Sequence, residues 1–139
     1  MKALRNIKII SIIIMILPLA YMGFIWYLSS KPSDAVINTG LPFDRLLKEC
    51  LHLIEFAVLY LLWVIAFTAV GRFSRQTNKL SAAISVLYAF ADELHQYFIP
   101  CRSATITDLL KDTAGVVIAY LIIKNIRSRK IASGPSNTH

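Results

Sequence analysis

The chain alternates long apolar runs with short polar segments. The four apolar runs cover residues 9–28, 46–70, 80–98 and 106–123. A helix that crosses a membrane needs about 20 predominantly apolar residues, and each run is close to that length. The pattern therefore predicts an all-α fold, an integral membrane four-helix bundle.

The first run follows a basic segment, residues 1–8, a combination that also occurs in signal peptides. However, the run is longer than the roughly 7 to 15 residues of a signal-peptide core, and no small-residue cleavage pattern follows it. We therefore predict a first membrane helix that the protein retains. Pro18 lies in its middle, where neighbouring helices can satisfy the carbonyl that a proline frees, so we expect a kink rather than a break.

The composition also indicates a membrane protein. Hydrophobic residues make up 56% of the 139 residues and the mean hydropathy is +0.58, whereas soluble domains contain roughly 45 to 50% apolar residues. The net charge of the chain is +7, and nucleic-acid-binding proteins are also positively charged. Here the basic residues cluster at the ends of the apolar runs rather than along one polar face, so we expect no nucleic-acid partner.

The distribution of charge predicts the orientation. The two chain ends and the connection at 71–79 carry 10 basic and no acidic residues, whereas the opposite side carries 5 basic and all 8 acidic residues. The positive-inside rule then gives an N-in, C-in topology, with both chain ends and the connection at 71–79 in the cytoplasm. Residues 1–8 form a cytoplasmic N-terminus, residues 9–123 the four-helix domain and residues 124–139 a basic cytoplasmic tail.

Polar residues interrupt the apolar runs near their predicted outer ends. An ionised side chain in the hydrocarbon region costs several kcal/mol, so such residues usually pair, face the protein interior or line a wet cavity. Three runs place these residues at similar depth, which predicts one shared pocket in the outer leaflet. The candidate ligand-binding residues are Lys48, His52, Glu55, Asp92, Glu93, Gln96, Arg102, Asp108, Lys111 and Asp112.

Helical spacing groups several of these residues. Asp92 and Gln96 are four residues apart, as are Asp108 and Asp112, so each pair lies on one helical face. Gly115 continues the second face, and its missing side chain would permit close approach by another helix.

A purely structural explanation stays open for the same residues. Lys48, Arg102 and Lys111 could pair with the acids in a network that fixes helix packing, and the two lysines could instead extend to the interface without a role. If Arg102 does not pair in such a network, we expect it to lie over the mouth of the predicted outer-leaflet pocket. His95 points to a different face from Asp92, so we expect it to pack or to lie at the interface.

The start of the last run has a local explanation too. Asp108 lies in the first turn, where the helix dipole favours an acid, and Thr105 or Thr107 is the expected cap.

The two cysteines, Cys50 and Cys101, show no metal-type spacing, and either a single disulfide or two small side chains at helix ends would fit them. A metal site needs three or more convergent ligands, and without HExxH or comparable spacing we predict no metal and no cofactor.

A set of polar and glycine residues around the last two runs has a linked spacing. It consists of Asp92, Glu93, Gln96, Phe98, Pro100, Arg102, Asp108, Asp112 and Gly115. Together with an upstream Lys-x-x-x-His at Lys48 and His52, this spacing resembles the signature of the VanZ-like membrane proteins over about residues 20–123. The chain departs from the family at Ala119, where a second small glycine is common.

The resemblance implies a small four-helix protein of the bacterial cytoplasmic membrane. The family takes its name from a member linked to resistance to teicoplanin, a lipid-bearing glycopeptide antibiotic, and no reaction is settled for it. A pocket at the interface suits a molecule with one polar and one acyl end. The expected partners are therefore a membrane lipid, a lipid-linked cell-wall precursor or the lipoglycopeptide.

Two functions from different classes follow. In the first, which we favour, the pocket binds or remodels such a molecule: Arg102, Lys111 and Lys48 attract a phosphate, and the acids attract an amine or hydroxyls.

In the second, the protein is an enzyme in which Glu93 or Asp92 is the catalytic base and His52 its partner, acting on a lipid head group. A proton-coupled transporter is a third alternative. It would require a homo-oligomer, because the chain is about half as long as a typical transporter.

Overall fold

The computed structural model describes residues 2–32, 44–100, 102 and 104–132, and the side chains of residues 9–32, 50–100, 102 and 104–129. The regular elements within these residues are all helices. They are α1 (Lys2–Ser29), α3 (Asp44–Ala69), α4 (Arg75–Tyr97) and α5 (Ile106–Ala132). The prediction of an all-α fold is confirmed, and the helices follow the order of the four apolar runs.

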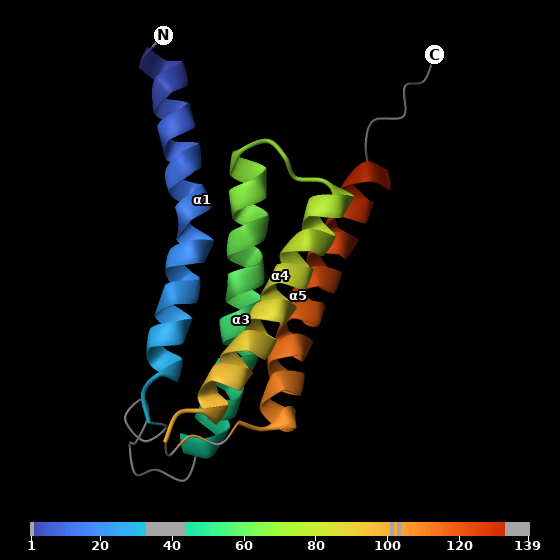
Figure 1. The fold of residues 1–139 in the computed structure, drawn as a ribbon. Coiled ribbons are helices and arrows are strands. Elements are labelled where there is room, and N and C mark those ends of the chain that lie inside the picture. The colour runs from blue at the N-terminus through green and yellow to red at the C-terminus, as the bar shows by residue number, and fades with distance from the viewer. Residues whose placement is uncertain (1, 33–43, 101, 103, 133–139) are drawn as a thin grey trace.

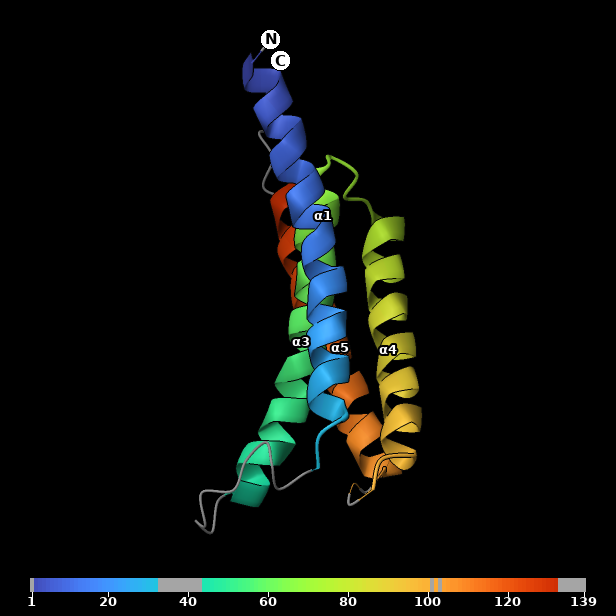
Figure 2. The same ribbon diagram turned by 60° about the vertical axis from the view of Figure 1, so that its left-hand side comes forward.

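The helices run up and down in chain order (Figure 1). Helix α3 contacts each of the other three helices. The N-terminal turns of α1 extend beyond the other helices in both views (Figures 1 and 2). We call the end of the bundle that holds His52, Asp92 and Asp112 the acidic end, and the end that holds Arg75 and Arg127 the basic end.

Helices α1 and α5 extend well beyond their apolar runs. Helix α1 begins at Lys2 rather than at residue 9, and α5 continues to Ala132 rather than ending at residue 123. Both extensions are rich in lysine and arginine, which are good helix formers. These two helices therefore continue beyond the ends of their apolar runs.

The connection between α3 and α4 is fixed by local hydrogen bonds. Gly71 has a φ of 68°, and the N–H groups of Gly71 and Arg72 donate to the carbonyls of Thr68 and Phe67 at 3.0 and 2.9 Å. This is a Schellman motif, which needs the left-handed backbone that glycine adopts without steric cost.

Helix α4 starts with a capping box. The Oγ of Ser74 accepts from the N–H of Thr77 at 3.1 Å, and the Oγ1 of Thr77 accepts from the N–H of Ser74 at 2.7 Å. Two backbone donors that would otherwise lack partners are thereby satisfied. The sequence assigned this segment to the polar connection, because its hydrophobicity is low.

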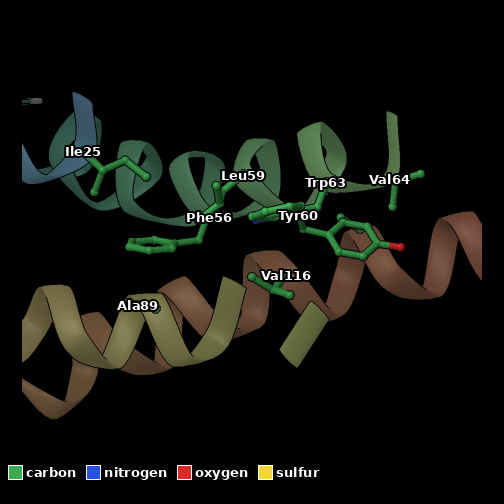
Figure 3. Packing of buried hydrophobic residues seen from close by; sticks show 9 residues of the cluster. Ile25, Phe56, Leu59, Tyr60, Trp63, Val64, Ala89 and Val116 are labelled. Carbon is green, nitrogen blue, oxygen red and sulfur yellow. The ribbon is translucent and has the colours of Figure 1, made fainter. Parts of the chain in front are cut away.

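The apolar core is built around α3. It is shown in Figure 3, and α3 supplies most of its side chains while α1, α4 and α5 contribute one labelled residue each. The labelled residues are Ile25, Phe56, Leu59, Tyr60, Trp63, Val64, Ala89 and Val116. Pro18 is fully buried as well, and α1 continues through it without a break.

Helix α4 is polar inside and apolar outside. Its side chains at Leu87 and Phe90 are 69% and 58% exposed, whereas Ser81 and Ser85 are fully buried. The buried residues of α4 are Asn78, Ser81, Ser85, Ala89, Asp92, Glu93 and Gln96. Helix α4 thus turns its polar stripe toward the other helices and its apolar side chains outward.

Two helices in the described part of the chain are long and apolar enough to cross a membrane. The segments are Ile9–Ser29 in α1 and Cys50–Ala69 in α3. The crossing of the membrane by all four helices and the N-in, C-in topology stay predictions.

Candidate functional site: the acidic end of the bundle

Asp92 links α1 and α4 at the acidic end. Its side chain is 1% exposed, and its Oδ2 accepts from the Oγ of Ser29 at 2.8 Å and from the Nε2 of Gln96 at 2.7 Å. Its Oδ1 is buried and has no hydrogen-bond partner among the described residues. The shared face of Asp92 and Gln96 was predicted, whereas Ser29 was not among the candidates.

Glu93 lies next to Asp92 but points toward α5. Adjacent helical residues diverge by about 100°, so the two acids serve different neighbours. The Oε1 of Glu93 accepts from the backbone N–H of Thr105, while its Oε2 is buried without a hydrogen-bond partner in the described part of the chain. Glu93 therefore ties α4 to the segment that begins α5.

Thr105, one of the two residues predicted as the cap, caps α5. Its Oγ1 accepts from the backbone N–H of Asp108 at 3.2 Å and donates to the Oδ2 of Asp108 at 2.6 Å. Lys111 lies one turn further on and donates from its Nζ to the Oδ1 of Asp108 at 3.1 Å. These contacts fix the first turns of α5 at the acidic end.

His52 and Asp112 join α3 to α5. The Nδ1 of His52 lies 3.4 Å from the Oδ1 of Asp112, and the Asp112 side chain is 1% exposed. The distance allows an ion pair, but the geometry is not that of a hydrogen bond, and both Asp112 oxygens are without one among the described residues. Glu55 lies one turn along α3, where its carboxyl group interacts electrostatically with His52, Asp92 and Asp112.

Gly115 allows the two helices to approach this closely. A Cβ at this position would overlap the backbone carbonyl oxygen of Leu53 on α3. The predicted close approach of a second helix at Gly115 is confirmed, and it brings the neighbouring turn of α5, with Asp112, against His52.

Arg102 has different partners from those the sequence suggested. Its Nη1 donates to the backbone carbonyls of Leu28 and Lys31 at 2.9 and 2.8 Å, and its Nε donates to the Oε1 of Gln96 at 3.2 Å. A cation is favourable at the C-terminal end of a helix, where carbonyls lack intrahelical partners. Arg102 thus holds the end of α1 against the end of α4.

His95 makes a second set of contacts between the end of α1 and α4. Its ring stacks on Trp26 with a centroid distance of 3.9 Å, and its Nε2 lies 3.0 Å from the Oγ of Ser30. Of the two roles expected for His95, packing or a place at the interface, its ring contact with Trp26 shows packing. The sequence signal for these α1 contacts was the aromatic and serine composition at the end of the first apolar run.

The comparisons with known proteins bear on this set of residues. A family model described as VanZ/LLP1 matches residues 6–127. The chain belongs to the VanZ/LLP1 family. A search of curated proteins and a search of solved structures each found no match.

Membership of the VanZ/LLP1 family confirms the resemblance seen in the sequence. The family match and the two apolar helices together support a membrane protein. The candidate residues whose side chains are described lie at the acidic end, and the side chain of Lys48 is outside the described part. No group of three His, Cys, Asp or Glu side chains among the described residues is arranged to hold a metal ion.

Two further features of this VanZ/LLP1 protein are a hollow between two helices and a cysteine on α3. A hollow of about 150 Å³ lies between α4 and α5, lined by residues that include Lys79, Val86 and Tyr120. Cys50 is exposed and free, and Cys101 lies outside the described residues.

Proposed function

We propose that this VanZ/LLP1 protein crosses the bacterial cytoplasmic membrane with all four helices and uses its acidic end to bind or remodel the polar part of an amphipathic molecule. The candidate molecules are a membrane lipid, a lipid-linked cell-wall precursor and a lipoglycopeptide antibiotic. Engagement of the last would give resistance to teicoplanin.

The observation that carries this proposal is the set of buried carboxylate oxygens without donors. Asp92, Glu93 and Asp112 are each at least nine-tenths buried, and each leaves one or two oxygens without a hydrogen bond among the described residues. Leaving such a charged acceptor unsatisfied costs about 1–3 kcal/mol or more, and buried polar groups in proteins rarely lack partners. A bound polar group would supply the missing donors.

The location of these acids supports an amphipathic ligand. They lie at one end of helices whose outer surfaces are apolar, such as Leu87 and Phe90 on α4. A molecule whose head enters the acidic end can therefore leave its acyl chains against the same apolar surfaces.

The crossing of the membrane by α4 can be tested with single cysteines. In a protein with Cys50 and Cys101 replaced by serine, cysteines are placed at Arg75 and Tyr97, two exposed positions at opposite ends of α4. A membrane-impermeant thiol reagent should label the Tyr97→Cys protein in intact cells and the Arg75→Cys protein only after the cells are opened. Labelling of both from one side would contradict a membrane-spanning α4.

The binding function predicts that purified protein retains an amphipathic molecule. Asp112→Asn replaces an acceptor by an amide that also donates, so it should lower the retained amount about tenfold or more, as expected for a hydrogen bond to a charged group. The measurement is mass spectrometry of molecules extracted from the purified full chain. Ser128→Ala, an exposed change on α5 near the basic end, should leave the amount unchanged.

Retention that is equal in wild type and Asp112→Asn would favour a purely structural network.

A second candidate function, an enzyme acting on a lipid head group, is favoured by the pairing of His52 with a buried carboxylate, since such a carboxylate orients a catalytic histidine. Under that alternative, Glu93→Gln should stop turnover and leave binding intact. Loss of both together would favour the binding function.

A further inference from the structure

The hollow between α4 and α5 has mainly apolar walls and a volume of about 150 Å³. Its lining residues are Lys79, Ala82 and Val86 of α4 and Val116, Val117 and Tyr120 of α5. The hollow opens to the outer surface of the bundle, where the Val117 side chain is 45% exposed. An apolar cavity of about this volume takes up a molecule the size of benzene. The hollow is therefore large enough for several methylene groups of an acyl chain.

Lys79 is the charged residue of this lining. It is exposed and lies in the second turn of α4, which begins at the basic end (Figure 1). Its ammonium group has no hydrogen bond or ion pair among the described residues. Arg102 and Lys111, at the acidic end, instead donate to acceptors of the protein itself. Lys79 thus places an unengaged cation beside an apolar hollow.

The helical register brings more positive charge to the same side of the hollow. Arg75 lies one turn before Lys79, and Lys124 lies one turn after Tyr120, so each continues one wall of the hollow toward the basic end. No acidic residue occurs in the connection at 71–79 or at either chain end. An anionic group beside Lys79 would therefore meet basic side chains without competing carboxylates.

We propose that the hollow binds an acyl chain of an anionic diacyl phospholipid whose phosphate lies against Lys79. This inference rests on the proposed membrane crossing of α4 and α5, which places the basic end at the cytoplasmic head groups. A lysine at this level extends its ammonium to the head groups while its methylene groups cover apolar surface. Val86 lies seven residues further along α4, about 10 Å deeper. The α4 wall therefore follows the first part of an acyl chain below its head group.

The charge at the hollow distinguishes this occupant from two others. A zwitterionic phosphatidylcholine would fill the hollow equally well, but its trimethylammonium group would bring a second positive charge toward Lys79. The apolar face of a second copy of the chain would also fill the hollow, but it would leave the Lys79 ammonium without an acceptor. Only an anionic lipid matches both the apolar walls and the unengaged cation.

The test is a competition between two phospholipids with identical acyl chains. Equal amounts of phosphatidylglycerol and phosphatidylcholine are added to the detergent-purified full chain, and bound lipid is measured by native mass spectrometry. We expect wild type to bind phosphatidylglycerol at least about fivefold more, the effect of one basic residue near a membrane surface. This comparison needs no variant and so cannot fail through misfolding.

Two matched charge variants assign the preference to Lys79. Lys79→Gln should lower the phosphatidylglycerol to phosphatidylcholine ratio by about fivefold. Arg129→Gln removes the same charge from the same end of the bundle. However, Arg129 is exposed and lies nine residues after Tyr120, which places it on the opposite face of α5. The Arg129→Gln protein should therefore keep the wild-type ratio.

A second pair of variants tests the hollow itself. Ala82→Leu places extra carbon atoms in the hollow, so most of the bound phosphatidylglycerol should be lost. Ala83→Leu adds the same atoms at the neighbouring exposed position and should keep the wild-type amount. Asp112→Asn, which tests the acidic end, should keep the preference for phosphatidylglycerol. A failure of the proposed binding function at the acidic end is thereby distinguishable from a failure of this inference.

Three results would overturn the lipid site. The first is equal binding of the two lipids by wild type, and the second is a preference that Lys79→Gln leaves unchanged. The third is a wild-type dimer that Ala82→Leu abolishes while lipid binding stays the same, which would assign the hollow to a second copy. The cysteine labelling of α4 tests the membrane crossing separately, so a failure there is distinguishable from a failure in the lipid competition.

Discussion

The Gly115→Ala variant should unfold at a clearly lower temperature than the wild-type protein. Its new Cβ would overlap the carbonyl oxygen of Leu53, which is backbone and cannot rotate away. Helices α3 and α5 must then separate, and overpacking of this kind costs about 1–3 kcal/mol and occasionally more. Thermal unfolding in detergent, followed by circular dichroism, measures the loss.

Gly23→Ala provides the matched control. A Cβ at Gly23 has no neighbouring atom within 4 Å, and alanine is the better helix former. We expect this variant to keep the wild-type unfolding temperature or to exceed it slightly. A Gly115→Ala protein as stable as Gly23→Ala would show that α3 and α5 do not pack as closely as the acidic end requires.

Replacing Arg102 by alanine should loosen the C-terminal end of α1. The carbonyls of Leu28 and Lys31 and the Oε1 of Gln96 would each lose a charged donor, and a hydrogen bond to a charged group contributes about 1.5–3 kcal/mol. Hydrogen exchange should accelerate over the last turns of α1. Arg129→Ala, an exposed change near the basic end, should leave exchange in α1 unchanged.

This experiment also separates the two roles of Arg102. If the variant loses its ligand while exchange in α1 stays at the wild-type rate, Arg102 contacts the ligand itself, as the sequence suggested. If α1 loosens, the residue positions a helix, and any loss of binding follows from that movement.

The sequence predicted the features that depend on helical periodicity. The all-helical order, the shared face of Asp92 and Gln96, the close approach at Gly115 and the cap by Thr105 all follow from spacing within one helix or from the size of one side chain. Such signals are local, so they need no knowledge of which helices are neighbours.

The features that were missed depend on tertiary contacts or on polar sequence that is nevertheless helical. The bond from Ser29 to Asp92 and the bonds of Arg102 to α1 join residues more than 60 positions apart. The early start of α4 at Arg75 and the buried Asn78 were hidden because the low hydrophobicity of residues 71–79 marked them as a connection. The spacing of Asn78, Ser81 and Ser85, continued by Asp92, was the available signal for that buried polar face.

The central claim is that acids from α4 and α5 meet His52 of α3 at one end of the bundle. Cross-linking of paired cysteines in native membranes tests it most directly, in a protein whose own cysteines are replaced by serine. His52→Cys with Asp112→Cys should cross-link through a short bifunctional thiol reagent, because the native side chains lie 3.4 Å apart. His52→Cys with Ser128→Cys, at the far end of α5, should not. Failure of the first pair, or equal cross-linking of both, would contradict the account.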